Sequence, residues 1–217
     1  MRFFLLFLSF ICSFAYSQNI QDLVKNVKSQ KIEIKNPNNQ VVASYSFENN
    51  DWQSKTTAKD SNWTKMMTLL PVTQNINYTP HCNTCQKPLN KREPVLVQGK
   101  TLVSYQHEES DHKREILLEF LNNRLISKEN IVTKFDKNNA ENLQNYNITF
   151  EYTYQNNLLT KILVRYIIAE RNAEGMGVST FEEYIAIDYD DKNQRISLSY
   201  TSENQPQAVK YTLHYGK

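Results

Sequence analysis

Two cysteines and two histidines have side chains and spacings that could hold a metal ion. Cys82 and Cys85 form a C-x2-C pair, and His107 and His112 follow as an H-x4-H pair. Two thiolates and two imidazoles are a suitable tetrahedral set for zinc, and both spacings fall in the range that such sites use. The segment between the pairs contains a predicted hairpin that could bring them together. A zinc ion bound by these four residues is therefore one interpretation.

A disulfide bond between Cys82 and Cys85 is the interpretation that we favour. The remaining cysteine, Cys12, lies in a predicted leader, so the exported chain would keep only this pair of thiols. Exported proteins fold in oxidising compartments, where two such cysteines usually join. Acidic residues surround His107 and His112, which is typical of a solvated loop. We therefore predict a disulfide and no resident cofactor, with zinc as the alternative.

Other reactive patterns are incomplete. A thioredoxin-type role for the C-x2-C pair would need a βαβ unit and a helix that begins at the first cysteine, and the sequence predicts neither. One oxygen-rich cluster consists of Asp188, Asp190, Asp191 and Asn193. It lacks the turn glycine and the distal glutamate of an EF-hand calcium loop, so it predicts a hairpin turn. Because no carboxylate pair and no histidine–nucleophile pair has a catalytic spacing, the sequence favours a protein that is not an enzyme.

The first seventeen residues predict a secretory signal peptide. Arg2 gives a positive start, an apolar run follows from Phe3 to Ala15, and small residues stand at the positions that signal peptidase reads. The apolar run is too short to cross the hydrocarbon core of a bilayer. We therefore expect cleavage after Ser17, an exported (periplasmic or secreted) product that starts at Gln18, and no transmembrane segment in that mature chain.

Charge and composition exclude some partners. The formal net charge is +2, and removal of Arg2 with the leader would leave +1. A near-neutral chain without blocks of like charge gives no electrostatic reason to expect nucleic acid or an anionic membrane as partner. Gly occurs only 4 times, so phosphate-binding glycine loops are not expected. Abundant asparagine is expected to supply the left-handed turn positions instead.

The spacing of apolar residues predicts one helix followed by strands. Ile20, Leu23, Val24 and Val27 have helical spacing, which predicts a short amphipathic helix at roughly 19–29. Alternation and turn residues then predict hairpins. The expected strands are 31–35, 41–47, 95–97, 101–105, 116–121, 124–127, 148–155, 158–169, 183–189, 195–201 and 208–215.

Turn chemistry marks where these hairpins reverse. Asn122–Asn123, Asn156–Asn157 and Asp190–Asn193 are expected at hairpin tips, because the central residues of tight hairpin turns must accept a left-handed backbone. Residues 49–93 hold both tryptophans and the C-x2-C pair, and they predict a long irregular region.

These elements predict an all-β, mainly antiparallel fold in which successive hairpins form a curved meander sheet or a half-barrel, with one short N-terminal helix. Residues 18–217 are expected to form a single β-rich domain. The predicted function is that of an exported, non-enzymatic protein that binds another protein or a small apolar ligand. Tyrosine- and leucine-rich strand faces leave open a lipid or small-molecule carrier with a half-open β-barrel. An enzyme with dispersed catalytic residues, or a thiol–disulfide protein, is a third alternative.

Processing of the leader can be tested on protein from its own host. Intact mass should place the amino terminus at Gln18 without lipid, and Cys12→Ser should be exported as well as the unmodified chain. The reason is that the bulky Phe10 and Ile11 do not match the small residues that precede a lipidated cysteine. A Cys12→Ser protein that accumulates uncleaved would instead identify Cys12 as a lipidation site.

Overall fold

The computed structural model of the chain describes residues 29–48, 51–56, 60–70, 89–135, 143–172 and 175–216. Three predicted features lie outside these residues: the leader with its cleavage site, segment 19–28 of the predicted helix, and the Cys82–Cys85 pair. They stay predictions.

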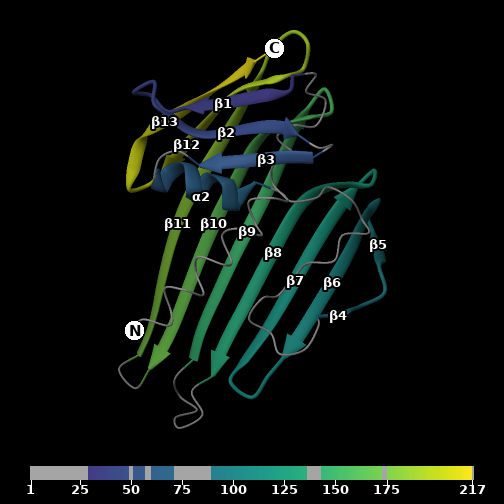
Figure 1. The fold of residues 1–217 in the computed structure, drawn as a ribbon. Helices are drawn as coiled ribbons and strands as arrows, with labels where there is room; N and C mark the ends of the chain where they lie inside the picture. The colour runs from purple at the N-terminus through teal and green to yellow at the C-terminus, as the bar shows by residue number, and fades with distance from the viewer. Residues whose placement is uncertain are drawn as a thin grey trace. The chain divides into compact units, whose positions relative to one another are not determined.

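Thirteen strands and one helix make up the described part of the chain (Figure 1). The helix, α2, spans Ser61–Leu69, and no helix in the described ranges is long and apolar enough to cross a membrane. The strands are β1 (Lys31–Lys35), β2 (Val41–Glu48), β3 (Asp51–Thr56), β4 (Asn90–Lys91), β5 (Val95–Val97), β6 (Lys100–Glu108), β7 (His112–Leu121), β8 (Arg124–Phe135), β9 (Leu143–Gln155), β10 (Leu158–Asn172), β11 (Gly175–Tyr189), β12 (Arg195–Ser202) and β13 (Gln205–Gly216).

The strands form one sheet with the order β3-β2-β1-β13-β12-β11-β10-β9-β8-β7-β6-β4, and β5 pairs with β6 outside this path. From β6 to β13 each strand lies beside the next one in the sequence, which is the arrangement of a meander of hairpins. The pairings along β6, β7, β8 and β9 are antiparallel, as are those of β1, β2, β12 and β13. The prediction of an all-β, mainly antiparallel fold built from successive hairpins is therefore confirmed.

Asparagine residues form the tips of these hairpins. Asn122 and Asn123 have φ values of 52° and 61°, and Asn156 and Asn157 have values of 47° and 67°. Two consecutive left-handed residues are the requirement of the tight turn that matches the twist of the flanking strands. Asn193 is also left-handed, with a φ of 62°. The three predicted hairpin tips are therefore confirmed.

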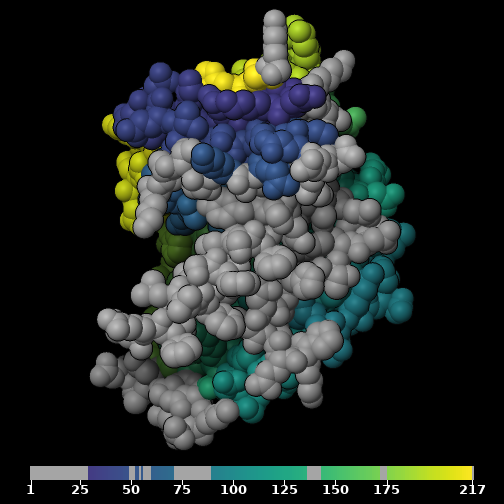
Figure 2. Space-filling view, viewed as in Figure 1, coloured from purple at the N-terminus to yellow at the C-terminus, as the bar shows by residue number. Residues whose placement is uncertain are grey.

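The first described strand pairs with the last one. In the antiparallel register of β1 and β13, Ile34 lies opposite Leu213 and Ile32 lies opposite Tyr215. Both isoleucines are buried. In the space-filling view, purple atoms of β1 lie beside yellow atoms of β13 (Figure 2). Local alternation identifies each of these strands, but it does not reveal that they pair, because the partners are far apart in the sequence.

The described residues divide into two compact units. Within the described ranges, the first unit contains residues 29–70, Tyr154–Lys161 and 184–216, and the second contains residues 89–153 and 162–183. Strands β9, β10 and β11 contribute residues to both units. The helix α2 belongs to the first unit, and the candidate site described below belongs to the second.

Strand β3, helix α2 and strand β4 lie within 49–93, where the sequence predicts no regular element. That expectation is wrong for these three segments. The helix begins after Asp60, whose side chain accepts a hydrogen bond of 2.9 Å from the Trp63 backbone N–H and so caps the helix. Trp63, Met66 and Met67 are buried at helical spacing. The signal was present, but it covers only nine residues, and the prolines and cysteines nearby favoured a loop.

Asp60 also joins the helix to strand β13. The Tyr211 hydroxyl donates a hydrogen bond of 2.8 Å to Asp60 Oδ1, and the centroids of the Trp63 and Tyr211 rings lie 5.3 Å apart. Burial and the hydrogen bond to the carboxylate raise the pKa of Tyr211 above its ordinary value. One carboxylate therefore caps the helix and satisfies a buried hydroxyl.

We expect Asp60→Ala to lower the free energy of unfolding by about 1–3 kcal/mol, because it removes the helix cap and leaves the Tyr211 hydroxyl without its acceptor. Asp60→Asn keeps an acceptor oxygen and should lose less. Urea denaturation followed by tryptophan fluorescence measures both. Unchanged stability of Asp60→Ala would show that this carboxylate does not anchor the helix.

Candidate metal centre

The turn between β6 and β7 places two histidines and a glutamate next to one another. β6 ends at Glu108 and β7 begins at His112. The Glu109 backbone N–H donates a hydrogen bond of 2.8 Å to the His112 carbonyl, which closes the turn. His107 lies opposite Arg114 in the register of the two strands. A short turn thus brings residues 107, 109 and 112 to one corner of the sheet.

Strand alternation directs His107 into the core. Val103, Tyr105 and His107 share one face of β6, and they are 1%, 0% and 4% exposed. The prediction that His107 lies in a solvated loop is wrong, because the alternation of β6 continues to the end of the strand. Glu109 is also largely covered, with a side chain that is 18% exposed.

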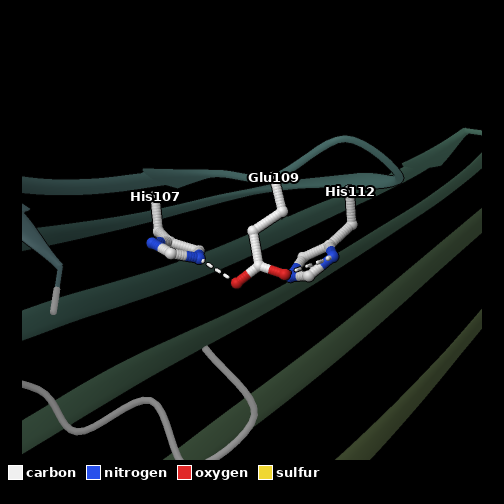
Figure 3. A group of neighbouring side chains, drawn as sticks. All are labelled: His107, Glu109 and His112. Atoms are coloured by element: carbon white, nitrogen blue, oxygen red, sulfur yellow. Dashed lines mark hydrogen bonds and ion pairs between the residues drawn. The ribbon is translucent and has the colours of Figure 1, made fainter. Parts of the chain in front are cut away.

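The side chains of the turn converge on one point. His107 Nε2 lies 2.6 Å from Glu109 Oε1, and His112 Nδ1 lies 4.0 Å from Glu109 Oε2. One ligand atom from each of the three residues lies within 4.8 Å of the other two. The Glu109 carboxylate lies between the two imidazole rings (Figure 3). We call this set the His107–Glu109–His112 triad.

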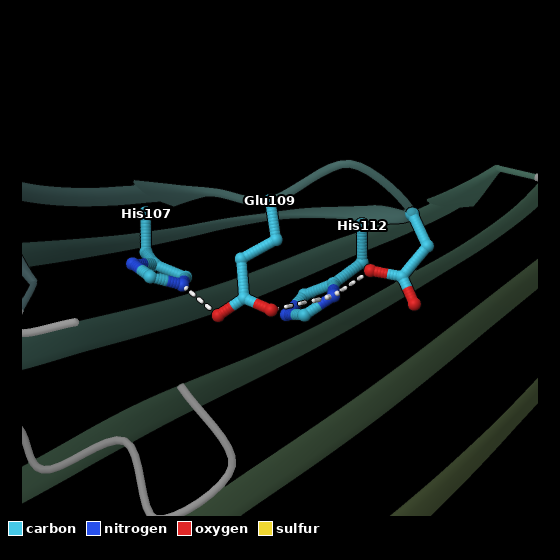
Figure 4. Close-up of polar contacts among 4 residues, drawn as sticks. His107, Glu109 and His112 are labelled. Carbon is cyan, nitrogen blue, oxygen red and sulfur yellow. Dashed lines mark hydrogen bonds and ion pairs between the residues drawn. The ribbon is translucent and has the colours of Figure 1, made fainter. Parts of the chain in front are cut away.

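A second carboxylate supports the triad from outside. Asp111 Oδ1 lies 2.9 Å from His112 Nδ1, a contact drawn with those of the triad in Figure 4. Asp111 thus engages the same ring nitrogen that lies 4.0 Å from Glu109 Oε2, so His112 would bind a metal through Nε2 while Asp111 holds the ring by Nδ1. The Asp111 carbonyl accepts a hydrogen bond of 2.8 Å from the Phe135 N–H, so β8 helps to hold this turn.

Two imidazoles and one carboxylate are donors that suit zinc and related divalent transition metals. Ligand atoms of a tetrahedral zinc site lie about 3.3 Å apart, because each lies roughly 2.0–2.1 Å from the ion. The distance between His107 Nε2 and Glu109 Oε1, 2.6 Å, is shorter than this, and the distance between His112 Nδ1 and Glu109 Oε2, 4.0 Å, is longer. Metal binding would therefore require the Glu109 and His112 side chains, which are 18% and 22% exposed, to shift. Three protein ligands would leave at least one coordination position for another group.

The structure tests only part of the predicted zinc site. It brings His107 and His112 together, as that alternative requires. Cys82 and Cys85 lie outside the described residues, so neither their disulfide nor their participation in a zinc site is tested. Glu109 was not predicted as a ligand. The signal that could have identified it is the short turn between two alternating strands, which holds an acidic side chain beside both histidines.

The predicted turn at residues 190–193 contains no sign of a calcium loop. Asp190 Oδ1 accepts hydrogen bonds of 2.9 Å and 2.8 Å from the backbone N–H groups of Lys192 and Gln194. Asp188 accepts from the Ser197 hydroxyl at 2.5 Å. These carboxylates therefore serve the hairpin itself, as expected for residues that close a turn.

Comparisons with protein-family models, curated proteins and solved structures return no match to this chain. Within the described ranges, the His107–Glu109–His112 triad is the set of metal-binding side chains close enough to share one ion.

Burial of His107 predicts a stability effect that an exposed histidine would not have. We expect His107→Ala to lower the free energy of unfolding of the metal-free protein by about 1–3 kcal/mol, because it removes a buried ring and its hydrogen bond to Glu109. His214→Ala, an exposed position on β13, is the matched control and should change stability by no more than about 0.5 kcal/mol. Equal effects of the two substitutions in urea titrations would contradict the buried position of His107.

Proposed function

We propose that this protein is an exported, non-enzymatic binding protein and that its ligand at the β6–β7 turn is a divalent transition metal, with zinc as the first candidate. The observation that carries the proposal is the convergence of three donor side chains from one short turn within 4.8 Å. The predicted leader supports export.

A hydrogen-bonded pair alone does not account for this arrangement. The contact between His107 and Glu109 would satisfy the buried ring by itself. His112 is nevertheless placed beside the second oxygen of Glu109, and Asp111 holds its ring. A turn that served only to give His107 a hydrogen-bond partner would need neither His112 beside Glu109 nor Asp111 beside His112. The additional donor and its carboxylate support are what a metal site requires.

A binding role fits the surroundings of the triad better than catalysis. Three protein ligands with an open position are also found in catalytic zinc sites, which add a general base or acid that does not bind the metal. Among the described residues, the other carboxylate in contact with the triad is Asp111, and it is engaged by His112. This supports capture of the metal rather than activation of a bound water.

Zinc titration of chelator-treated mature protein tests the proposal. We expect one zinc ion per chain by calorimetry, with affinity that falls as pH falls because imidazoles must lose their proton to bind. His107→Ala and Glu109→Gln should each abolish this binding. Zinc at about 100 times its dissociation constant should add roughly 2.7 kcal/mol to the free energy of unfolding.

Matched controls distinguish the triad from other sites. Glu108→Gln changes the exposed acidic neighbour of the turn and should bind zinc normally. A Cys82→Ser, Cys85→Ser double variant should also bind normally, because the proposed ligand set contains no sulfur. The proposal is wrong if the double variant loses zinc while His107→Ala keeps it.

A further inference from the structure

Three rows of side chains define one face of the second unit. The registers of β6, β7, β8 and β9 place directly opposite residues on the same face of the sheet. The rows are Val103, Leu118, Lys128 and Phe150; Tyr105, Ile116, Asn130 and Ile148; and His107, Arg114, Val132 and Tyr146. We call this set the basic face, because its two strongly basic side chains, Arg114 and Lys128, lie among residues that are otherwise mainly apolar.

The acidic residues of β7, β8 and β9 lie on the opposite face and have partners there. Glu129 follows Lys128 in the chain and therefore points the other way, where it accepts a hydrogen bond of 2.6 Å from Asn147. Glu115 accepts from Gln106 at 2.7 Å. The alternation of β7 and β8 thus separates their acids from their buried bases.

Lys128 is a half-buried cation that has no acidic partner among the described residues. Its Nζ lies 5.3 Å from the centre of the Phe150 ring, and no carboxylate in the described ranges is within ion-pair distance of it. Burial lowers the pKa of Lys128, and the positive charge of Arg114 lowers it further. An anion placed at the Lys128 ammonium group would offset this effect.

The side chains around Lys128 indicate what kind of anion would fit. Val132, Ile148 and Phe150 lie on the same face and are only half-buried. A small anion such as acetate would leave this apolar surface uncovered, whereas an alkyl chain would cover it. The buried Glu183 lies on β11, three strands from β8 in the sheet order, and accepts a hydrogen bond of 2.9 Å from the Tyr166 hydroxyl.

We propose that the basic face binds one long-chain carboxylate, with its acid group at Lys128 and its alkyl chain over the half-buried side chains of β9. The charged end is held by the ammonium group and by the neighbouring guanidinium charge. The alkyl chain supplies most of the affinity through the apolar area it covers. This ligand differs from the proposed metal ion, and its binding does not depend on the His107–Glu109–His112 triad being loaded.

Displacement of a fluorescent dansyl-undecanoate from the mature chain, in the presence of chelator, tests this proposal. Dodecanoate should displace the probe at one site per chain. 1-Dodecanol, which has the same chain without the charge, should compete at least about tenfold less well, and acetate should not compete. If dodecanol competes as well as dodecanoate, the site recognises only an apolar chain. If acetate competes as well as dodecanoate, the site recognises only a small anion. Either result, or no binding of the probe, overturns the proposal.

Substitution of Lys128 provides the second arm of the test. Lys128→Met should weaken dodecanoate at least about tenfold, leave dodecanol unchanged and raise the melting temperature of the free protein, because it removes a buried charge. Lys128→Arg should keep most of the affinity. Lys161→Met is the matched control, since Lys161 also lies over an aromatic ring, at 4.9 Å from the Tyr184 centroid, but is exposed. Equal losses in Lys128→Met and Lys161→Met would contradict the assignment.

Discussion

The register of the sheet decides the face on which every side chain lies, and hairpin turns fix that register. Asn122 and Asn123 adopt left-handed conformations between β7 and β8, which allows a tight reversal without glycine. A slip by one residue would move each side chain of a strand to the opposite face. The burial of His107 and the position of Lys128 both follow from this constraint. Strand alternation, the β6–β7 turn at Glu109 and the register of β7 on β8 together thus decide which side chains form the triad and the basic face.

The two faces of the second unit therefore carry different kinds of side chain. On one face, acids and amides form hydrogen bonds and ion pairs, among them Arg165 with Glu151 and Glu182. On the other face, Arg114 and Lys128 lie among apolar side chains, and burial disfavours the charge of each. A buried charge without an opposite charge beside it is costly for stability. Lys128, which has no carboxylate within ion-pair distance among the described residues, is therefore the physical reason to propose a ligand on this face.

Much of the fold could be predicted from the sequence because its signals are local. Alternation identified the strand pairs, and asparagine pairs such as Asn156–Asn157 identified their turns. The pairing of β1 with β13 could not be predicted, since nothing local specifies a partner at the other end of the chain. The helix α2 was missed because its buried stripe spans little more than two turns. In the site, the two histidines were recognised from their spacing, whereas Glu109 required knowledge of the turn that directs it between them.

The coordination shell of bound zinc tests the central claim most directly. X-ray absorption at the zinc edge, on unmodified mature protein loaded with one equivalent of zinc, distinguishes nitrogen and oxygen ligands at about 2.0–2.1 Å from sulfur at about 2.3 Å. The triad predicts a shell of nitrogen and oxygen only, with multiple scattering from two imidazoles. A sulfur shell at the longer distance would place the metal on Cys82 and Cys85 and contradict the assignment to His107, Glu109 and His112.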